Sequence, residues 1–136
     1  MMATYQTPAW ALELPAGWTA AQREDHVVIA LPFPAAQLRL TPYRDETDTM
    51  TPEKWVRWTE QLHRKRGRTV IARKCGDFHG YEVRFAALGD WIRGWALVAN
   101  GVGVDINYRC PEAEAKRDDA EIDAVLSTLR LLPIAT

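Results

Sequence analysis

Apolar and polar residues alternate on both sides of Asn100-Gly101. This pair is the preferred turn of a tight two-residue hairpin, because Asn and Gly both tolerate a positive φ. A type I′ turn here predicts a face with the pairs Ala99–Val102, Leu97–Val104, Trp95–Ile106, Arg93–Tyr108 and Trp91–Cys110. That face is apolar except for Arg93. The opposite face of the hairpin carries mostly small or polar residues.

A third strand is predicted over residues 81–87, where apolar and polar residues again alternate. Its apolar residues join the apolar face of the hairpin only if the turn near Gly89 holds an odd number of residues. A three-residue loop, 88–90, meets this condition. We therefore expect a core face built from Tyr81, Val83, Phe85, Trp91, Trp95, Leu97, Val104, Ile106 and Tyr108.

Shorter apolar patterns predict further strands at residues 10–14, 27–31 and 37–41, and from residue 69 to a joint near residues 77–80. Turn-forming or acidic segments separate them. The acidic stretch 45–48 is expected to be a solvated loop, and residues 131–134 are expected to dock as a tail.

Two segments have the periodicity of an amphipathic helix. Thr51-Pro52 offers a side-chain cap and a proline at the first helical position, and Gly67 can end this helix. Asp118 and Glu121 resemble a capping box for the second helix. The expected apolar stripes are Trp55, Trp58, Thr59 and Leu62 in the first helix and Ile122, Val125, Leu126 and Leu129 in the second.

These elements predict a single α+β domain over residues 1–136. Its architecture is a twisted antiparallel β-sheet of six to seven strands flanked by two main helices. We expect the C-terminal helix to cover the core face and the helix that carries Trp55 to pack at or across the other face.

Composition narrows the class of partner. Apolar residues make up 47% and charged residues 26% of the 136 residues, and the formal net charge of −1 argues against nucleic-acid binding driven by bulk charge. No signal-peptide pattern or bilayer-spanning run is present, so we expect a cytoplasmic protein without a membrane span. Cys75 and Cys110 are too few for a disulfide framework, and the sequence leaves their pairing open. No motif predicts a catalytic residue, a metal or a cofactor.

Arg93 interrupts the predicted core face, with Trp91 and Trp95 on its own strand and Tyr108 opposite. One interpretation is an anchor for an anionic or carbonyl group inside an aromatic-walled pocket, where the guanidinium stacks on the rings. The other is structural: an arginine that lies over aromatic edges at the sheet margin or pairs with a carboxylate, because an unpaired buried charge is costly.

The polar face is the second candidate site. We expect it to carry Glu82, Arg84, Asp105, Asn107 and Arg109 above a shallow floor of Gly94 and Ala96. Such a face can bind a partner protein or a small polar ligand, although half-solvated antiparallel sheets have the same pattern without binding anything.

Three further patterns have simpler structural interpretations. Six basic residues, Arg64, Lys65, Arg66, Arg68, Arg73 and Lys74, suggest a nucleic-acid patch but also fit a helix end followed by a charged edge strand. Cys75 and His79 have neither the further ligands of a zinc site nor the signature of a nucleophile pair. The acidic residues of the predicted second helix start, Asp118, Asp119, Glu121 and Asp123, fit dipole-compensating surface charge better than a cation site.

The order of elements resembles the PsbP-like α/β/α sandwich superfamily. The residues that carry the resemblance are Leu14-Pro15-Ala16-Gly17-Trp18, Trp55, Gly80-Tyr81, Trp95, Tyr108 and Ser127-Thr128-Leu129-Arg130. The superfamily is named for a photosystem II accessory protein, and it includes a Ran-binding nuclear-import factor and many small bacterial proteins. The resemblance covers nearly the whole chain in layout, and the shared residues are packing positions.

The resemblance implies a non-enzymatic binding or assembly factor. Small bacterial members occur beside secreted toxins, as effector chaperones or adaptors of type VI secretion, or as immunity-like proteins. Chaperone-type members engage apolar effector segments through an exposed hydrophobic sheet surface, whereas the second face here is polar. We therefore expect an accessory factor that binds another protein, such as a toxin or secreted effector, through the polar face or the surroundings of Arg93. The alternative is a small-molecule binding protein or enzyme with an aromatic-walled pocket around Arg93.

Overall fold

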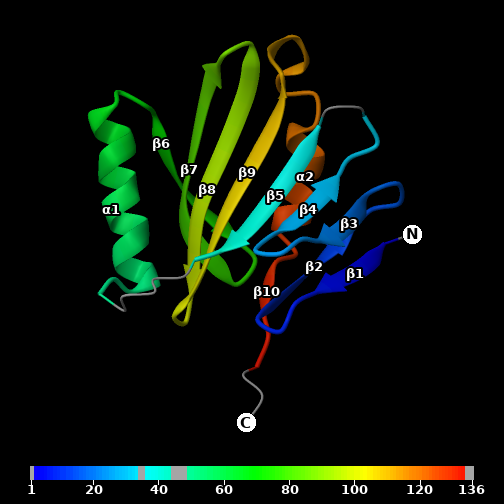
Figure 1. Ribbon diagram of the computed structural model, residues 1–136, viewed down its shortest axis with the longest axis horizontal. Coiled ribbons are helices and arrows are strands. Elements are labelled where there is room, and N and C mark those ends of the chain that lie inside the picture. Colours follow the sequence, from blue (N-terminus) through cyan, green and yellow to red (C-terminus); the bar gives the residue numbers. More distant parts are fainter. Residues whose placement is uncertain (1, 34–35, 44–48, 134–136) are drawn as a thin grey trace.

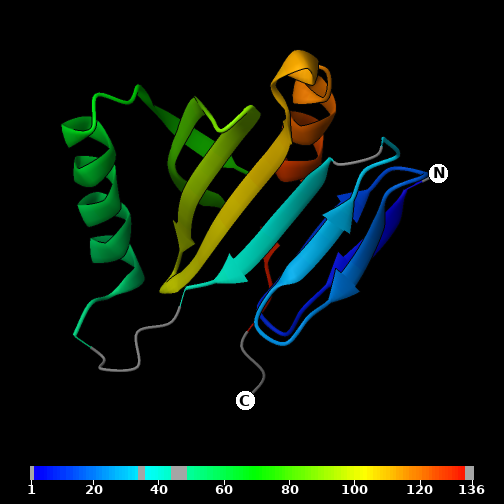
Figure 2. The same cartoon turned by 45° about the horizontal axis from the view of Figure 1, so that its top comes forward.

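The computed structural model describes residues 2–33, 36–43 and 49–133. In these ranges the chain forms a seven-stranded sheet, a smaller three-stranded sheet and two α-helices (Figure 1). The helices lie on opposite faces of the large sheet (Figure 2). The α+β fold predicted from the sequence is confirmed. The acidic loop expected at residues 45–48 and the end of the C-terminal tail lie outside the described residues.

All strand pairs are antiparallel. In spatial order, the large sheet consists of β3 (Thr19–Gln22), β4 (Val27–Ala30), β5 (Gln37–Pro42), β9 (Val102–Pro111), β8 (Asp90–Ala99), β7 (Phe78–Ala87) and β6 (Val70–Cys75). The small sheet consists of β1 (Ala3–Gln6), β2 (Trp10–Leu14) and β10 (Arg130–Leu131). The sequence did not predict this second sheet, because β1 and β10 are short and depend on pairing with β2.

The β8–β9 hairpin confirms the turn at Asn100-Gly101. Both residues have positive φ, 48° and 79°, as a type I′ turn requires. The expected pairs from Ala99–Val102 to Trp91–Cys110 are all present.

The β7–β8 turn contradicts the three-residue loop predicted near Gly89. Ala87 pairs with Asp90, so the loop contains only Leu88 and Gly89, with φ of 53° and 82°. Leucine is rare at positive φ, and for this reason the sequence did not indicate a second type I′ turn. A slip of one residue reverses the faces of β7. Tyr81, Val83 and Phe85 therefore leave the predicted core face, and Glu82 and Arg84 join it.

The face with Trp95 and Ile106 forms the main core under α2 (Asp119–Leu126) and the small sheet. The opposite face is covered over part of its width by α1 (Pro52–Lys65), which packs against β6, β7, β8 and β9. A second apolar cluster forms there from Val56, Tyr81, Val83, Ala96 and Val98. Both expected helix positions are confirmed.

The two helix starts differ. Thr51 Oγ1 accepts a hydrogen bond from the Lys54 backbone N–H at 3.2 Å, so the predicted cap of α1 is present. Asp118 precedes α2, but its side chain does not cap the helix. The predicted capping box is wrong because the Asp118 carboxylate instead accepts a hydrogen bond from the Tyr108 hydroxyl at 2.6 Å.

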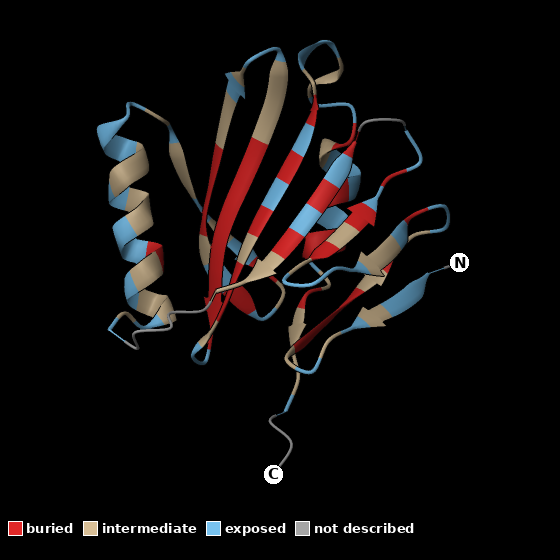
Figure 3. Ribbon diagram, viewed as in Figure 1, coloured by how far each residue is buried: buried red, intermediate tan, exposed pale blue. Residues whose placement is uncertain are grey.

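Burial marks where the large sheet is covered on both faces (Figure 3). Residues Arg93 to Ala99 in β8 are continuously buried, whereas buried and exposed residues alternate along much of β9 and β5. Alternation is the pattern of a sheet with only one covered face. The part of the sheet that α1 does not reach is therefore open to solvent along β5 and β9.

Candidate functional site

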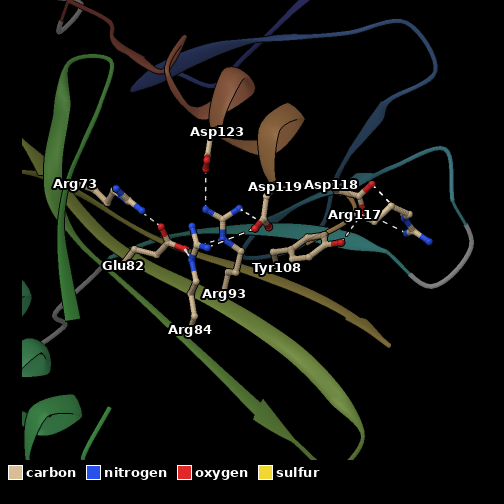
Figure 4. A network of polar contacts seen from close by, with 9 residues as sticks. All are labelled: Arg73, Glu82, Arg84, Arg93, Tyr108, Arg117, Asp118, Asp119 and Asp123. Atoms are coloured by element: carbon tan, nitrogen blue, oxygen red, sulfur yellow. Dashed lines mark hydrogen bonds and ion pairs between the residues drawn. The ribbon is translucent and has the colours of Figure 1, made fainter. Parts of the chain in front are cut away.

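Glu82 and Arg93 form the centre of a buried ionic network on the core face (Figure 4). Arg93 Nε donates to Glu82 Oε2 at 2.6 Å, and neither side chain has exposed surface. Arg84 Nε donates to the same carboxylate oxygen at 2.7 Å, and Arg73 Nε donates to Oε1 at 2.9 Å. Arg84 and Arg93 are direct cross-strand neighbours, so the Glu82 carboxylate offsets their mutual repulsion.

Helix α2 completes this network from above the sheet. Arg93 Nη1 lies 3.1 Å from Asp119 Oδ1, and Arg93 Nη2 lies 2.7 Å from Asp123 Oδ1. Arg84 Nη1 lies 3.4 Å from the other oxygen of Asp119. The guanidinium groups of Arg73, Arg84 and Arg93 thus form ion pairs with the carboxylates of Glu82, Asp119 and Asp123. These ion pairs link α2 to β7 and β8.

The pKa values agree with a fixed ion pair. Burial alone would raise the pKa of Glu82, but hydrogen bonds from Arg93, Arg84 and Arg73 lower it to about 2. Burial disfavours the charged form of Arg93, and its hydrogen bonds with Glu82 and Asp123 more than compensate, so its pKa is raised. Both groups are ionised over the whole physiological range.

Tyr108 continues the polar contacts toward the start of α2. Its hydroxyl donates to Asp118, which also receives a hydrogen bond from Arg117 Nη2 at 3.2 Å. Burial and the neighbouring Asp118 carboxylate raise the pKa of Tyr108. Arg117 in turn stacks on the Phe33 ring, with its guanidinium carbon 4.0 Å from the ring centroid.

The aromatic-walled pocket proposed around Arg93 is not open in this arrangement. Trp91, Trp95 and Tyr108 do share its face, as the hairpin register predicts. The Arg93 guanidinium carbon lies 4.7 Å from the Trp95 ring centroid, but α2 and its carboxylates enclose the group. Of the two interpretations of Arg93, the structure favours pairing with a carboxylate.

The polar face is present in altered form. Asn107 and Arg109 are exposed on the face that α1 leaves uncovered, and Asp105 lies half-buried beside them. Glu82 and Arg84, predicted on the same face, lie on the opposite one because of the shorter turn at Leu88-Gly89. Their places are taken by Phe85 and by two β5 residues that sequence reasoning missed, Gln37 and Arg39. The alternation along residues 37–41 marks these two as solvent-facing, but only the pairing of β5 with β9 brings them to the site.

We call the depression on this face the open groove, defined by Gln37, Arg39, Phe85, Ile92, Asn107 and Arg109. Its volume is about 400 Å³. Phe85 and Asn107 also line a narrower slot of about 80 Å³ that runs toward α1 and contains His63 and Asp105. The open groove therefore continues from the exposed strands to the edge of the helix.

Cationic groups dominate the exposed part of the open groove. Arg39 makes no side-chain hydrogen bond or ion pair with any described residue. Arg109 is 60% exposed and uses only Nε, at 3.3 Å from Asp90 Oδ2. Arg68 stacks on the Phe85 ring at 3.8 Å and donates to His63 Nδ1 at 3.0 Å. The two exposed arginines, Arg39 and Arg109, retain N–H groups for an external acceptor.

Two titratable groups in the slot are shifted toward neutrality. Burial, followed by the charges of Arg68 and Arg66, lowers the pKa of His63. Burial raises the pKa of Asp105, and its hydrogen bond from Asn107 opposes the rise only in part.

The remaining candidates from the sequence are separated by the fold. Cys75 is buried and pairs with Phe78, whereas the exposed His79 pairs with Lys74, so the side chains of Cys75 and His79 lie on opposite faces of the sheet. Asp118, Asp119 and Asp123 contact arginines, and Arg73 of the basic segment contacts Glu82.

Within the described ranges no group of three or more His, Cys, Asp or Glu side chains could hold a metal ion. None of the helices described is long and apolar enough to cross a membrane.

A second depression, which we call the end groove, lies between the two sheets. It has a volume of about 560 Å³, and its lining includes Trp10 from the small sheet and Val27, Thr41 and Val102 from the large one. Asp25 and His26, hydrogen-bonded at 2.5 Å, lie at its rim. Sequence reasoning missed this site because its walls come from segments far apart in the chain.

Comparison with known proteins concerns the fold. Cyanobacterial PsbP (CyanoP) from Synechocystis sp. PCC 6803 superposes with a TM-score of 0.57 at 13% identity over 96% of this chain and 92% of that one. This chain has the PsbP-like fold. LpqN of Mycobacterium tuberculosis, described as involved in cell envelope biogenesis, matches with a TM-score of 0.63 at 12% identity over 98% and 91% of the two chains.

The PsbP-like fold also matches a protein of Bacteroides thetaiotaomicron VPI-5482. Its TM-score is 0.63 at 14% identity, and the match spans 91% of this chain but 45% of that one. No family model matches the sequence, and no curated protein matches it. At this level of identity the likeness extends to the fold, so functional arguments rest on the residues of this chain.

Proposed function

We propose that this chain is a non-catalytic accessory factor that binds another protein through the open groove. The kind of factor is an immunity-like or adaptor/chaperone protein associated with bacterial secretion or toxin systems. The observation that carries the proposal is the uncovered strip of β5 and β9, on which Arg39, Asn107 and Arg109 face solvent from a rigid sheet. The backbone of these paired strands is already ordered, so partner binding costs conformational entropy mainly in the exposed side chains.

The composition of the open groove supports a polar contact surface with a small apolar anchor. Phe85 and Ile92 are half-buried, and the arginines and Asn107 surround them. A mixed surface of this kind is typical of non-obligate protein interfaces. It is less suited to holding a long apolar segment, which is the role of chaperone-type members of the superfamily.

The proposal that the protein is non-catalytic is supported by the structural ion pairs in which the carboxylates of the core face take part. The core-face carboxylates Glu82, Asp119 and Asp123 are tied to Arg93, so they are held in structural ion pairs. The cytoplasmic location expected from the sequence remains part of the proposal, and fractionation of source cells tests it.

Site-specific photo-crosslinking in source cells tests the binding surface. A photoreactive amino acid at position 107 is expected to trap a discrete partner, identified by mass spectrometry. The matched control carries the same group at position 61, which is exposed on α1 outside the open groove. Adding Arg39→Gln and Arg109→Gln to the position-107 protein should abolish the crosslink. Equal trapping from positions 107 and 61 would refute the proposal.

The end groove favours a small-molecule function as the second candidate. Its apolar lining beside Trp10 and its acidic rim at Glu24 and Asp25 suit an apolar ligand with a neutral or cationic head. A ligand that binds there should raise the melting temperature and change the emission of Trp10. Trp10→Phe should remove the emission change, and a cationic amphiphile library without any shift in melting temperature would count against this candidate.

A further inference from the structure

The two exposed arginines of the open groove have a fixed spacing. Arg39 lies directly opposite Asn107, which places Arg109, two residues along β9, diagonally across from it. Diagonal neighbours in an antiparallel pair are about 7–8 Å apart. In an extended peptide, side chains at positions i and i+2 point the same way and are separated by about 6.7 Å. Two acidic side chains two positions apart therefore match the two guanidinium groups.

An apolar anchor lies directly across the strands from Arg109. Ile92 is the direct neighbour of Arg109 on β8, and Phe85 is the direct neighbour of Ile92 on β7. The path from Arg39 therefore runs diagonally to Arg109 and then straight across β8 and β7 to this pair. Beside it, Gly94 has no side chain, so the floor next to Asn107 stays low.

We propose that the open groove holds an extended segment of a partner protein with the pattern acidic-x-acidic-x-apolar. This rests on the proposed function and adds the chemistry of the partner. The first acidic side chain pairs with Arg39, the second with the Nη groups of Arg109, and the apolar side chain packs on Ile92 and Phe85. Charge complementarity favours this occupant, because the exposed cations of the groove exceed what Asp90 neutralises.

The neighbouring carboxylates argue for a short acidic motif rather than a polyanion. Asp90 lies beside Arg109, and Asp105 lies two residues before Asn107 on β9. A nucleic-acid backbone carries closely spaced phosphates, and these would be repelled by the carboxylates of Asp90 and Asp105. A segment with two carboxylates can place each one on an arginine and turn neutral backbone toward the aspartates.

Binding of designed peptides tests the inference with the full chain. The probe is a fluorescein-labelled heptapeptide in which Glu, Glu and Leu occupy alternate positions separated by Ser. Control peptides replace both Glu by Gln, or Leu by Ser. Fluorescence anisotropy at low ionic strength should show a loss of affinity of about tenfold or more for the Gln peptide, a smaller loss for the Ser peptide, and weaker binding of the probe as salt increases.

Protein variants locate the site. Arg39→Gln and Arg109→Gln should each weaken binding of the Glu peptide several-fold while leaving the melting temperature unchanged. Arg57→Gln, which removes an exposed arginine of α1 outside the open groove, should have no effect on affinity. Amide shift changes in a titration should map to β5, β8 and β9.

The inference would be overturned if the Gln peptide or the Ser peptide bound as tightly as the Glu peptide. It would also be overturned if neither arginine variant changed the affinity for the Glu peptide, or if inorganic phosphate displaced the probe completely and bound as tightly as the peptide does. The last result would define a small-anion site instead. If the Glu peptide fails to bind while position 107 still traps a partner in cells, the acidic motif is wrong and the proposed function stands. If position 107 traps nothing, the proposed function fails as well.

Discussion

Glu82 Oε2 accepts a hydrogen bond from Arg93 Nε at 2.6 Å, and both side chains are completely buried beneath α2. A paired buried charge is tolerable, whereas removal of one partner leaves the other with a buried charge that is only partly compensated. The pair sits at the junction of β7, β8 and α2. It therefore connects the stability of the sheet with the attachment of the helix.

Glu82→Gln should destabilise the protein by about 3–5 kcal/mol, because Arg93 stays buried while its nearest carboxylate is lost. Equilibrium unfolding in urea measures this. The matched control is Glu60→Gln, which removes an exposed helical ion pair with Arg64 and should cost about 0.5 kcal/mol or less. Equal effects of the two substitutions would show that the buried pair is not a special contributor.

The stability of the protein should fall with acidification in a defined range. The pKa of Glu82 is lowered from its ordinary 4.5 to about 2 in the folded state. A depressed carboxyl pKa contributes stability above the unfolded pKa, and that contribution is lost as the pH falls from about 4.5 to about 2. The free energy of unfolding, measured from pH 6 to pH 2, should decline less steeply in Glu82→Gln. Identical slopes would contradict the role of this carboxylate.

Substitutions at the first position of the two type I′ turns should have opposite effects on the stability of the protein. Leu88 has a φ of 53° and is fully exposed, so Leu88→Asn relieves backbone strain without loss of packing and should stabilise by about 1 kcal/mol. Asn100 has a φ of 48°, and Asn100→Leu should destabilise by a similar amount. Thermal unfolding measures both. A loss of stability in Leu88→Asn would argue for a longer loop and for the other register of β7.

Both cysteines should be unreactive in the native protein. Cys75 and Cys110 are buried and unpaired, and burial raises the pKa of the Cys75 thiol to about 11. A chromogenic thiol reagent at pH 8 should label neither until denaturant is added, whereas a cysteine introduced at exposed Ser127 should react at once. Rapid labelling of a native cysteine in the wild-type protein would contradict the buried positions.

Local sequence signals predicted the elements whose stabilising contacts are themselves local. Asn100-Gly101 has a strong preference for one turn type, and the β8–β9 register followed from it. Thr51-Pro52 likewise marked the first residue of α1. In each case the physical cause lies within a few residues of the signal.

The sequence alone did not predict the face of β7 or the composition of the open groove. Leu88-Gly89 has weak turn preferences, so the loop length was ambiguous, and a change of one residue decides which side of the strand is buried. The tertiary structure selects the register in which Glu82 meets Arg93 and in which Tyr81 and Val83 pack under α1. The groove depends on the pairing of β5 with β9, more than sixty residues apart in the chain.

The sequence by itself therefore determined the longer strands, both helices, the register of one hairpin and the position of Arg93 as a charge on an apolar face. Only the tertiary structure decided that Arg93 is a structural ion pair and that Arg39 completes an exposed cationic site. The reason is that burial and charge pairing are set by contacts between segments distant in the chain. Alternation along a strand shows which residues share a face, but not what covers that face.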